Sequence, residues 1–146
     1  MKSAGTQMVV LRCKALANPV RLRILFLVKA RERCVCQIKA ATGLPNSTIS
    51  EQLSYLREAG LIVERREGRW AHFQVASDPE ARRFLKLVWP YLESDPSLCR
   101  DLEFLDQLPR RGKELAPAGP KPPQARIKQR TGGVKGPIPR QQAQAW

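Results

Sequence analysis

Apolar residues recur at three- and four-residue spacing through most of the first 108 positions, which is the period of helices packed on one face. Residues 6–16 show this spacing and predict a short first helix. The stretch ANPVRLRILFLVKA adds a start signal, because Asn18 can cap free backbone N–H groups and Pro19 suits the first helical position. The apolar positions of this second helix indicate that it is buried; they are Leu22, Leu25, Phe26 and Val28.

A helix-turn-helix is predicted next along the chain. Residues 37–42 form a short helical segment, and Gly43 closes it, since glycine is the usual residue just past a helix end. The stretch STISEQLSYLREAGL then places Ile49, Leu53 and Leu56 on one apolar stripe and leaves its other face polar. A short helix, a tight turn and a second helix with a polar outer face are typical of a DNA-reading unit.

A β-hairpin follows directly. Two β-rich runs, 62–66 and 69–75, flank the pair Glu67-Gly68, and the tip is rich in arginine. A helix-turn-helix with a basic hairpin behind it is a winged helix, whose hairpin can lie along the duplex and reach phosphates or the minor groove. The residues expected to contact DNA are Asn46, Ser47, Thr48, Ser50, Glu51, Gln52 and Tyr55 on the reading helix, and Arg65, Arg66 and Arg69 on the wing.

Two further helices are predicted after the wing. Each begins with an Asp-Pro pair, at Asp78 and Asp95, and Pro90 should end or kink the first of them. Their apolar stripes lie outside a small winged-helix core, so we expect them to need a partner surface, which a symmetric dimer supplies. The stripes are Phe84, Leu85 and Val88 in the first helix and Leu98, Leu102 and Leu105 in the second.

The fold class predicted is mainly α with a small β-hairpin, a dimeric winged helix-turn-helix with a disordered C-terminal tail. Residues 1–108 form the winged domain with its dimerisation helices. Residues 109–146 hold nine basic residues and one acid, a net charge of +8, and seven of the twelve prolines, so they have little to bury and are predicted to be disordered. Such a tail adds non-specific phosphate attraction, or it is a solubilising extension with no specific role.

The whole chain has 26 Lys plus Arg against 13 acids, a net charge of +13, which indicates a polyanionic partner, nucleic acid first. No apolar run approaches the length of a membrane span. The first residues lack the layout of a signal peptide. We therefore expect a cytoplasmic protein with no membrane partner, whose four cysteines are free thiols rather than disulfides.

The order of four blocks resembles the ArsR/SmtB family of bacterial metal-responsive repressors. The blocks are ALANPVRLRIL, CVC, STISEQLSYLREAGLI and RREGRWAHFQV, and the resemblance runs from about Val9 to Leu92. It implies a homodimeric repressor that sits on double-stranded operator DNA and leaves when an inducer binds. Family members commonly have histidine where this chain has Gln52, which can still donate to phosphate or pair with adenine.

The CVC block matches the arsenic-sensing branch, which implies that Cys34 and Cys36 supply thiolates to As(III) or Sb(III) as inducer. Thiolates are soft ligands that thiophilic ions select. Residues two apart do not face each other on a helix, so we expect the backbone to bend or unwind for both sulfurs to hold one ion, and this would shift the reading helix. The branch often has a third cysteine where this chain has Lys39; of the remaining candidates, Cys13 and Cys99, we favour Cys99 as the third metal ligand.

Other functions remain open on the sequence. A thiol-redox or reactive-sulfur sensor of the same fold would pair Cys36 with Cys99, and nearby Lys29, Arg31 and Arg33 should favour thiolates. A constitutive DNA-binding protein is a further alternative.

A zinc or cadmium sensor is disfavoured, because the zinc branch of the family it resembles uses Asp and His on the helix after the hairpin, and this helix has no histidine. An enzyme is disfavoured too: the single histidine, His72, lies in a predicted strand and is interpreted as an ordinary strand residue, and no phosphate-binding glycine loop is present.

Overall fold

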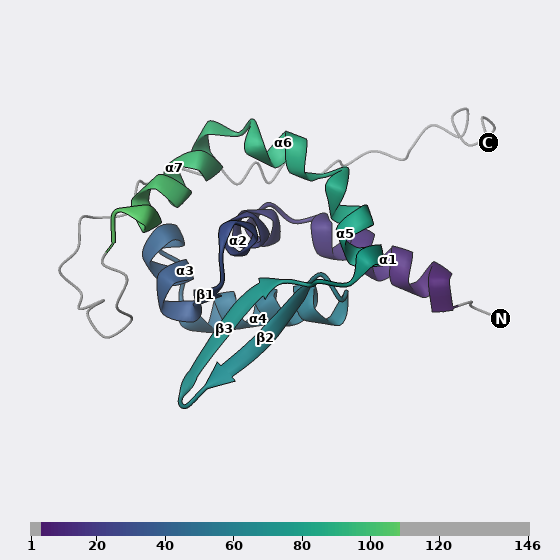
Figure 1. Cartoon of the computed structure of the whole chain (residues 1–146), viewed down its shortest axis with the longest axis horizontal. Helices are drawn as coiled ribbons and strands as arrows, with labels where there is room; N and C mark the ends of the chain where they lie inside the picture. The colour runs from purple at the N-terminus through teal and green to yellow at the C-terminus, as the bar shows by residue number, and fades with distance from the viewer. Residues whose placement is uncertain (1–3, 109–146) are drawn as a thin grey trace, which may run out of the picture.

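Helix α2 lies at the centre of the computed structural model, which describes residues 4–108, and the other elements surround it (Figure 1). The elements in chain order are α1 (Ala4–Leu16), α2 (Pro19–Ala30), β1 (Arg33–Cys34), α3 (Val35–Thr42), α4 (Asn46–Glu58), β2 (Ile62–Glu67), β3 (Trp70–Val75), α5 (Pro79–Lys86), α6 (Trp89–Glu93) and α7 (Pro96–Asp106). The tail predicted over residues 109–146 lies outside the described residues. No helix within residues 4–108 is long and apolar enough to cross a membrane.

The cap predicted for α2 is confirmed. The Asn18 side-chain oxygen accepts from the backbone N–H groups of Val20 and Arg21 at 2.9 and 3.1 Å. All six consecutive residues from Arg23 to Val28 are buried, so the middle of this helix is covered on every side. A helix without a solvent face must find a partner for every polar group it carries.

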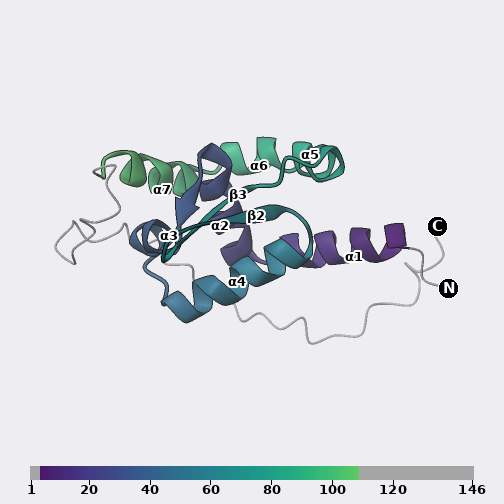
Figure 2. The same cartoon turned by 60° about the horizontal axis from the view of Figure 1, so that its bottom comes forward.

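The predicted helix-turn-helix is also confirmed. Helix α3 ends at Gly43, whose φ of 70° lies in the left-handed region where a side chain would be strained. Helix α4 then buries Ile49, Leu53 and Leu56, the three residues of the predicted stripe. Figure 2 shows α4 along the lower edge of the described part of the chain, and the residues on its opposite face are exposed or partly exposed.

The sheet differs from the predicted hairpin in two respects. Strands β2 and β3 pair as expected, but Glu67 pairs with Trp70, so the turn consists of Gly68 and Arg69, one residue later than predicted. Gly68 has a φ of 60°, which suits the first central position of a type II′ hairpin turn. A third strand, β1, pairs with the other edge of β3. It has two residues, too few to produce an alternating pattern in the sequence.

The two Asp-Pro helix starts are confirmed, but the first predicted helix is divided into α5 and α6, and the reason given for dimerisation is wrong. Asp78 and Asp95 cap α5 and α7, and the chain breaks between α5 and α6, just before Pro90. The apolar stripes, however, pack within the same chain: Leu85 and Leu105 join the main core, and Leu98 packs against Phe26 of α2. The sequence pattern shows that these faces are apolar but cannot show that the same chain covers them.

A buried ion pair holds α7 onto the core. The Arg23 guanidinium donates to both carboxylate oxygens of Asp101, through Nη2 at 2.8 Å and through Nε. Its Nη2 also donates to the backbone oxygen of Ala41, in α3, at 3.1 Å. Both side chains are more than nine-tenths buried. One arginine of α2 therefore joins the first helix of the helix-turn-helix to the last helix of the described chain.

We expect Asp101→Ala to destabilise the fold by about 3–5 kcal/mol, because it leaves the Arg23 charge buried without a counter-charge. Urea unfolding followed by circular dichroism measures the change. Glu103→Ala, at an exposed position of the same helix, should stay within about 0.5 kcal/mol of the parent. Replacing both partners, Arg23→Met with Asp101→Leu, should recover most of the loss. An unfolding midpoint of Asp101→Ala equal to that of the parent would contradict the assigned role.

Candidate nucleic-acid interface and cysteine site

Helix α4 presents to solvent the residues that the sequence selects for DNA contact. Tyr55 is 47% exposed, Thr48 and Gln52 are partly exposed, and the remaining members of the set are exposed. These polar side chains share the helix with the three buried residues of the apolar stripe, so the buried and outward faces are clearly divided. The outward set on this helix is Asn46, Ser47, Thr48, Ser50, Glu51, Gln52 and Tyr55.

The sequence did not predict a contact between α2 and two residues of this face, Gln52 and Tyr55. The Arg21 side chain, from α2, donates through Nη1 to the Oε1 atom of Gln52 at 2.8 Å. Its guanidinium carbon also lies 4.8 Å from the centre of the Tyr55 ring. The partners are 31 and more residues apart along the chain, and no local pattern links such distant positions.

The three wing arginines differ in how far their charges are already matched. Arg65 donates to the Glu32 carboxylate and, at 3.1 Å, to Glu67. These acids raise the pKa of Arg65, and the hydrogen bonds from Arg65 lower the pKa of Glu32. Arg66 pairs with Glu64 at 3.2 Å. Arg69, at the turn of the wing, has no ion-pair partner among residues 4–108.

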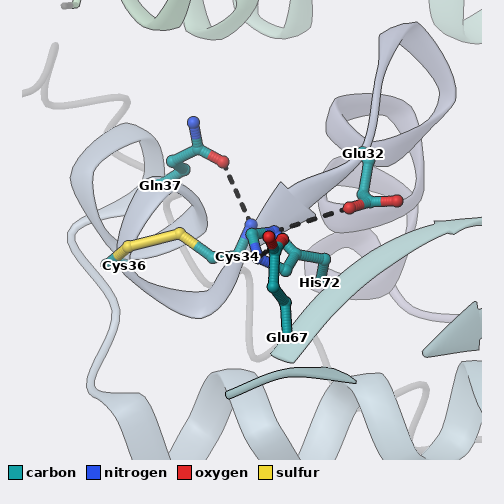
Figure 3. Close-up of a disulfide and its surroundings, with 6 residues drawn as sticks. All are labelled: Glu32, Cys34, Cys36, Gln37, Glu67 and His72. Atoms are coloured by element: carbon teal, nitrogen blue, oxygen red, sulfur yellow. Dashed lines mark hydrogen bonds and ion pairs between the residues drawn. A yellow bond between two sulfur atoms is a disulfide. The ribbon is translucent and has the colours of Figure 1, made fainter. Parts of the chain in front are cut away.

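The two cysteines of the CVC block are joined by a disulfide, which corrects the expectation of free thiols at these positions (Figure 3). Cys34 is the last residue before α3 and has extended backbone angles, while Cys36 lies in the first turn of that helix. Their Cα atoms are 5.4 Å apart, within the usual range for a disulfide. The sulfurs therefore meet without any unwinding of the helix, because only one of the two residues is helical; the predicted bending is not needed to bring them together.

The surroundings of the pair connect it to the wing. The Cys34 backbone N–H donates to the Gln37 side chain at 3.0 Å, and Cys34 is opposite His72 in the β1–β3 register. Figure 3 shows the His72 ring between two carboxylates, with Nδ1 3.6 Å from Glu32 and Nε2 3.8 Å from Glu67. His72 is a strand residue, as predicted, and it is opposite Arg65 in the β2–β3 register of the wing.

The two remaining cysteines are free and lie elsewhere. Cys13 is exposed on α1. Cys99 is partly buried in α7, and its Sγ atom donates to the Glu93 backbone oxygen at 3.4 Å. Among residues 4–108 no group of three His, Cys, Asp or Glu side chains is placed to hold a metal ion. The structure thus brings Cys34 and Cys36 together but does not add Cys99 to them.

The cations expected to favour thiolates all face carboxylates. Lys29 pairs with Glu93, and Arg31 lies 3.5 Å from Asp106. Arg33 lies 3.7 Å from the same acid, and burial lowers its pKa. Their positive charge is therefore partly matched by acids of α6 and α7.

Comparison with known proteins agrees with this geometry. The family model described as bacterial regulatory protein, arsR family, matches residues 18–63, which run from the cap of α2 into β2. An uncharacterised HTH-type transcriptional regulator of Methanocaldococcus jannaschii, MJ1325, is 37% identical over 76 residues, which are 51% of this chain and 84% of that protein. The arsenic resistance transcriptional regulator ArsR1 of Pseudomonas putida is 36% identical over 76 residues, or 51% of this chain and 58% of that protein.

A solved structure of similar fold carries the same family description. The solution structure of the homodimeric winged helix-turn-helix DNA-binding domain Mb0332 from Mycobacterium bovis, a possible ArsR-family transcriptional regulator, has a TM-score of 0.55 and 37% identity. The match covers 62% of this chain and 82% of that one. The chain spans little more than half the length of several of its curated relatives. The family match and these similarities together show that the chain is a winged helix-turn-helix protein of the ArsR family of bacterial regulatory proteins.

Proposed function

We propose that this protein is a transcriptional repressor that binds double-stranded operator DNA through α4 and the wing. The observation that carries the proposal is the polar outer face of α4 beside a hairpin that ends in Arg69. A helix with buried apolar residues on one side and hydrogen-bonding side chains on the other can enter a major groove without losing its packing. The net charge of +13 supports attraction to the phosphate backbone.

A homodimer is part of this proposal. Within residues 4–108, five large apolar side chains outside the reading helix and the wing are at least 40% exposed. They are Val9, Val10 and Leu11 on α1, and Leu87 and Tyr91 where α5 meets α6. A second copy of the chain would cover them. Support comes from Mb0332, which is described as homodimeric. In this account, residues 1–108 form the DNA-binding and dimerisation domain, and residues 109–146 are a basic extension.

Thr48→Ala combined with Gln52→Ala should weaken operator binding by at least about tenfold, since each lost base or phosphate contact is worth about 1–3 kcal/mol. The probe is a duplex that the parent protein selects from the promoter region of its own gene, titrated by fluorescence anisotropy. Glu58→Ala, exposed at the far end of α4, is the matched control and should bind like the parent. If the double variant binds with the parent's affinity, α4 is not the reading helix.

Arg69 should account for most of the wing's phosphate attraction, because Arg65 is already held by Glu32 and Glu67. We expect Arg69→Gln to reduce the slope of log affinity against log salt by about one unit per chain. Arg65→Gln should change the slope by clearly less. Equal slopes for the parent and Arg69→Gln would remove the tip of the wing from the interface.

The proposed inducer is As(III) or Sb(III), held by Cys34 and Cys36. The chemistry of the donors supports this: two sulfurs lie together at the entrance to α3, and soft ions select sulfur. The arsenic resistance function of the P. putida relative supports it as well. A disulfide has no thiolate to offer, so the bond between the two sulfurs must first take up two electrons and two protons from a thiol reductant to give two Cys–SH groups.

A thiol-redox repressor is the second candidate, and the disulfide itself favours it. Oxidation of Cys34 and Cys36 would then be the signal, with an oxidant or a polysulfide as the electron acceptor. The pair differs from the one expected on the sequence, since Cys36 is bonded to Cys34 rather than to Cys99. The two candidates differ in what releases the reduced protein from DNA, which is arsenite in the first and an oxidant or a polysulfide in the second.

We expect arsenite to release the reduced protein from its operator, and Cys34→Ser or Cys36→Ser to abolish the release while operator binding persists. Serine keeps the size of the side chain but lacks the soft sulfur, and a single remaining thiol cannot chelate. Anisotropy titrations with arsenite, after reduction and removal of the reductant, measure the release. Cys13→Ser, at an exposed site on α1, is the matched control and should respond like the parent.

Cys99→Ser tests the third ligand. A lost arsenite response would place Cys99 in the site, contributed across the dimer or after a rearrangement. A retained response would show that two protein sulfurs are enough. If arsenite leaves the reduced parent on DNA and a polysulfide releases it, the redox function holds instead.

A further inference from the structure

A single guanidinium from α2 contacts three parts of the winged helix. Arg21 donates through Nε to the Ala15 backbone oxygen at 2.7 Å and through Nη2 to that of Lys14 at 2.8 Å, both in the last turn of α1. Its Nη1 donates to Gln52 of α4 at 2.8 Å. The Tyr55 ring faces the guanidinium carbon at 4.8 Å. The nitrogens at the edge of the planar guanidinium thus donate hydrogen bonds, while its face lies against the Tyr55 ring.

These contacts fix which end of the Gln52 amide is free. A guanidinium has donors and no acceptor, so the atom of Gln52 that faces Arg21 must be the oxygen. The side-chain oxygen Oε1 is therefore turned toward α2, and the NH₂ group is the part of the amide left for another partner. Gln52 is partly exposed on the proposed reading face, so that partner can be DNA.

We propose that Gln52 meets the operator as a hydrogen-bond donor, with its NH₂ group turned toward the DNA, and that Arg21 is the positioning residue that imposes this orientation; the inference rests on the proposed function. The matching chemistry is an acceptor without an adjacent donor, which is offered by guanine O6 and N7 in the major groove or by a phosphate oxygen. The bidentate adenine pair is disfavoured, because it needs Oε1 on the DNA side of the amide, whereas this oxygen faces Arg21 of α2 and only its second lone pair is left.

Tyr55 reinforces the arrangement. A cation over an aromatic ring is attracted to it, and Tyr55 is 47% exposed beside Gln52 on α4. Lysine cannot replace Arg21 in this role, since an ammonium has no planar fork to reach α1 and Gln52 at once and no flat face for the ring. Arg21→Lys should thus release the Gln52 amide to rotate while keeping the positive charge.

The test compares the base preference of variants. Duplexes are selected from a random library by the parent, and the selected operator is then titrated with every single-base change. If the acceptor is guanine, we expect the parent to prefer guanine over adenine about tenfold at one position of each half-site. Gln52→Ala should abolish this preference, and Arg21→Lys should weaken it at the same position. Gln52→Glu, whose carboxylate can still accept from Arg21 but has no donor, should shift the preference toward cytosine.

If the acceptor is a phosphate, no base preference depends on Gln52. In that case Gln52→Ala and Arg21→Lys should both weaken binding to all selected duplexes by a similar factor, and Gln52→Glu should weaken it further by repulsion. Either pattern supports Gln52 as a donor through the Gln52→Glu variant, which keeps the acceptor for Arg21 and loses only the NH₂ group.

Arg12→Lys is the matched control. Arg12 also joins α1 to the end of α4, because its Nε atom donates to the backbone oxygen of Ala59 at 3.2 Å, but none of its hydrogen bonds, ion pairs or ring contacts within residues 4–108 involves Gln52. It should alter thermal stability without altering the base profile, as a merely structural role predicts.

Two results would overturn the proposal. One is that the parent prefers adenine at a position of the half-site and that Gln52→Ala removes this preference. The other is a folded Arg21→Lys whose base profile and affinity equal those of the parent; if that variant does not fold, a parent-like profile of Gln52→Glu is decisive in the same direction. A parent that selects no sequence at all would instead refute the proposed DNA-binding function.

Discussion

The burial of α2 is the constraint on which the other elements depend. Its middle is covered on all sides, yet it carries two arginines at its start, Arg21 and Arg23. Residues two apart point in nearly opposite directions from a helix, about 200° around its axis. Arg21 therefore reaches α1 and the reading face of α4, whereas Arg23 reaches Asp101 of α7 and the Ala41 carbonyl of α3. Through these two side chains, α2 sets the position of both helices of the helix-turn-helix.

The place of the cysteine pair follows from the same arrangement. Cys34 belongs to β1, which pairs with the wing strand β3, and Cys36 belongs to the first turn of α3, which packs against α4 and α7. A change in what the two sulfurs bind therefore acts on the junction of the wing and the helix-turn-helix. In the proposed function this junction is where inducer and operator favour different conformations. In the disulfide-bonded state the two sulfurs meet without unwinding of α3, because Cys34 precedes the helix and has extended backbone angles.

Local signals in the sequence predicted local structure well. Asn18, Asp78 and Asp95 were recognised as caps because their chemistry involves only neighbouring N–H groups. The buried stripe of α4 was recognised because its spacing matches the helical period. The wing was predicted to within one residue of its turn.

Contacts between distant residues could not be predicted in this way. The Arg23–Asp101 pair joins positions 78 residues apart, and the Arg21–Gln52 bond joins positions 31 apart. The same limitation explains the error over α7, whose stripe was apolar as expected but is covered by its own chain. At the candidate site, the identity of the residues came from the sequence, whereas the pairing of Arg65 with Glu32 came only from the fold.

The most direct test of the central claim is hydroxyl-radical footprinting of the full-length protein on its selected operator. Two copies of α4 in a symmetric dimer should protect two short stretches on one face of the duplex, about one helical turn apart from centre to centre. The Arg69→Gln variant should protect the DNA backbone less than the parent does at the positions that the tip of the wing contacts. A single protected stretch, or uniform protection along the whole duplex, would contradict a dimer that reads two half-sites through α4.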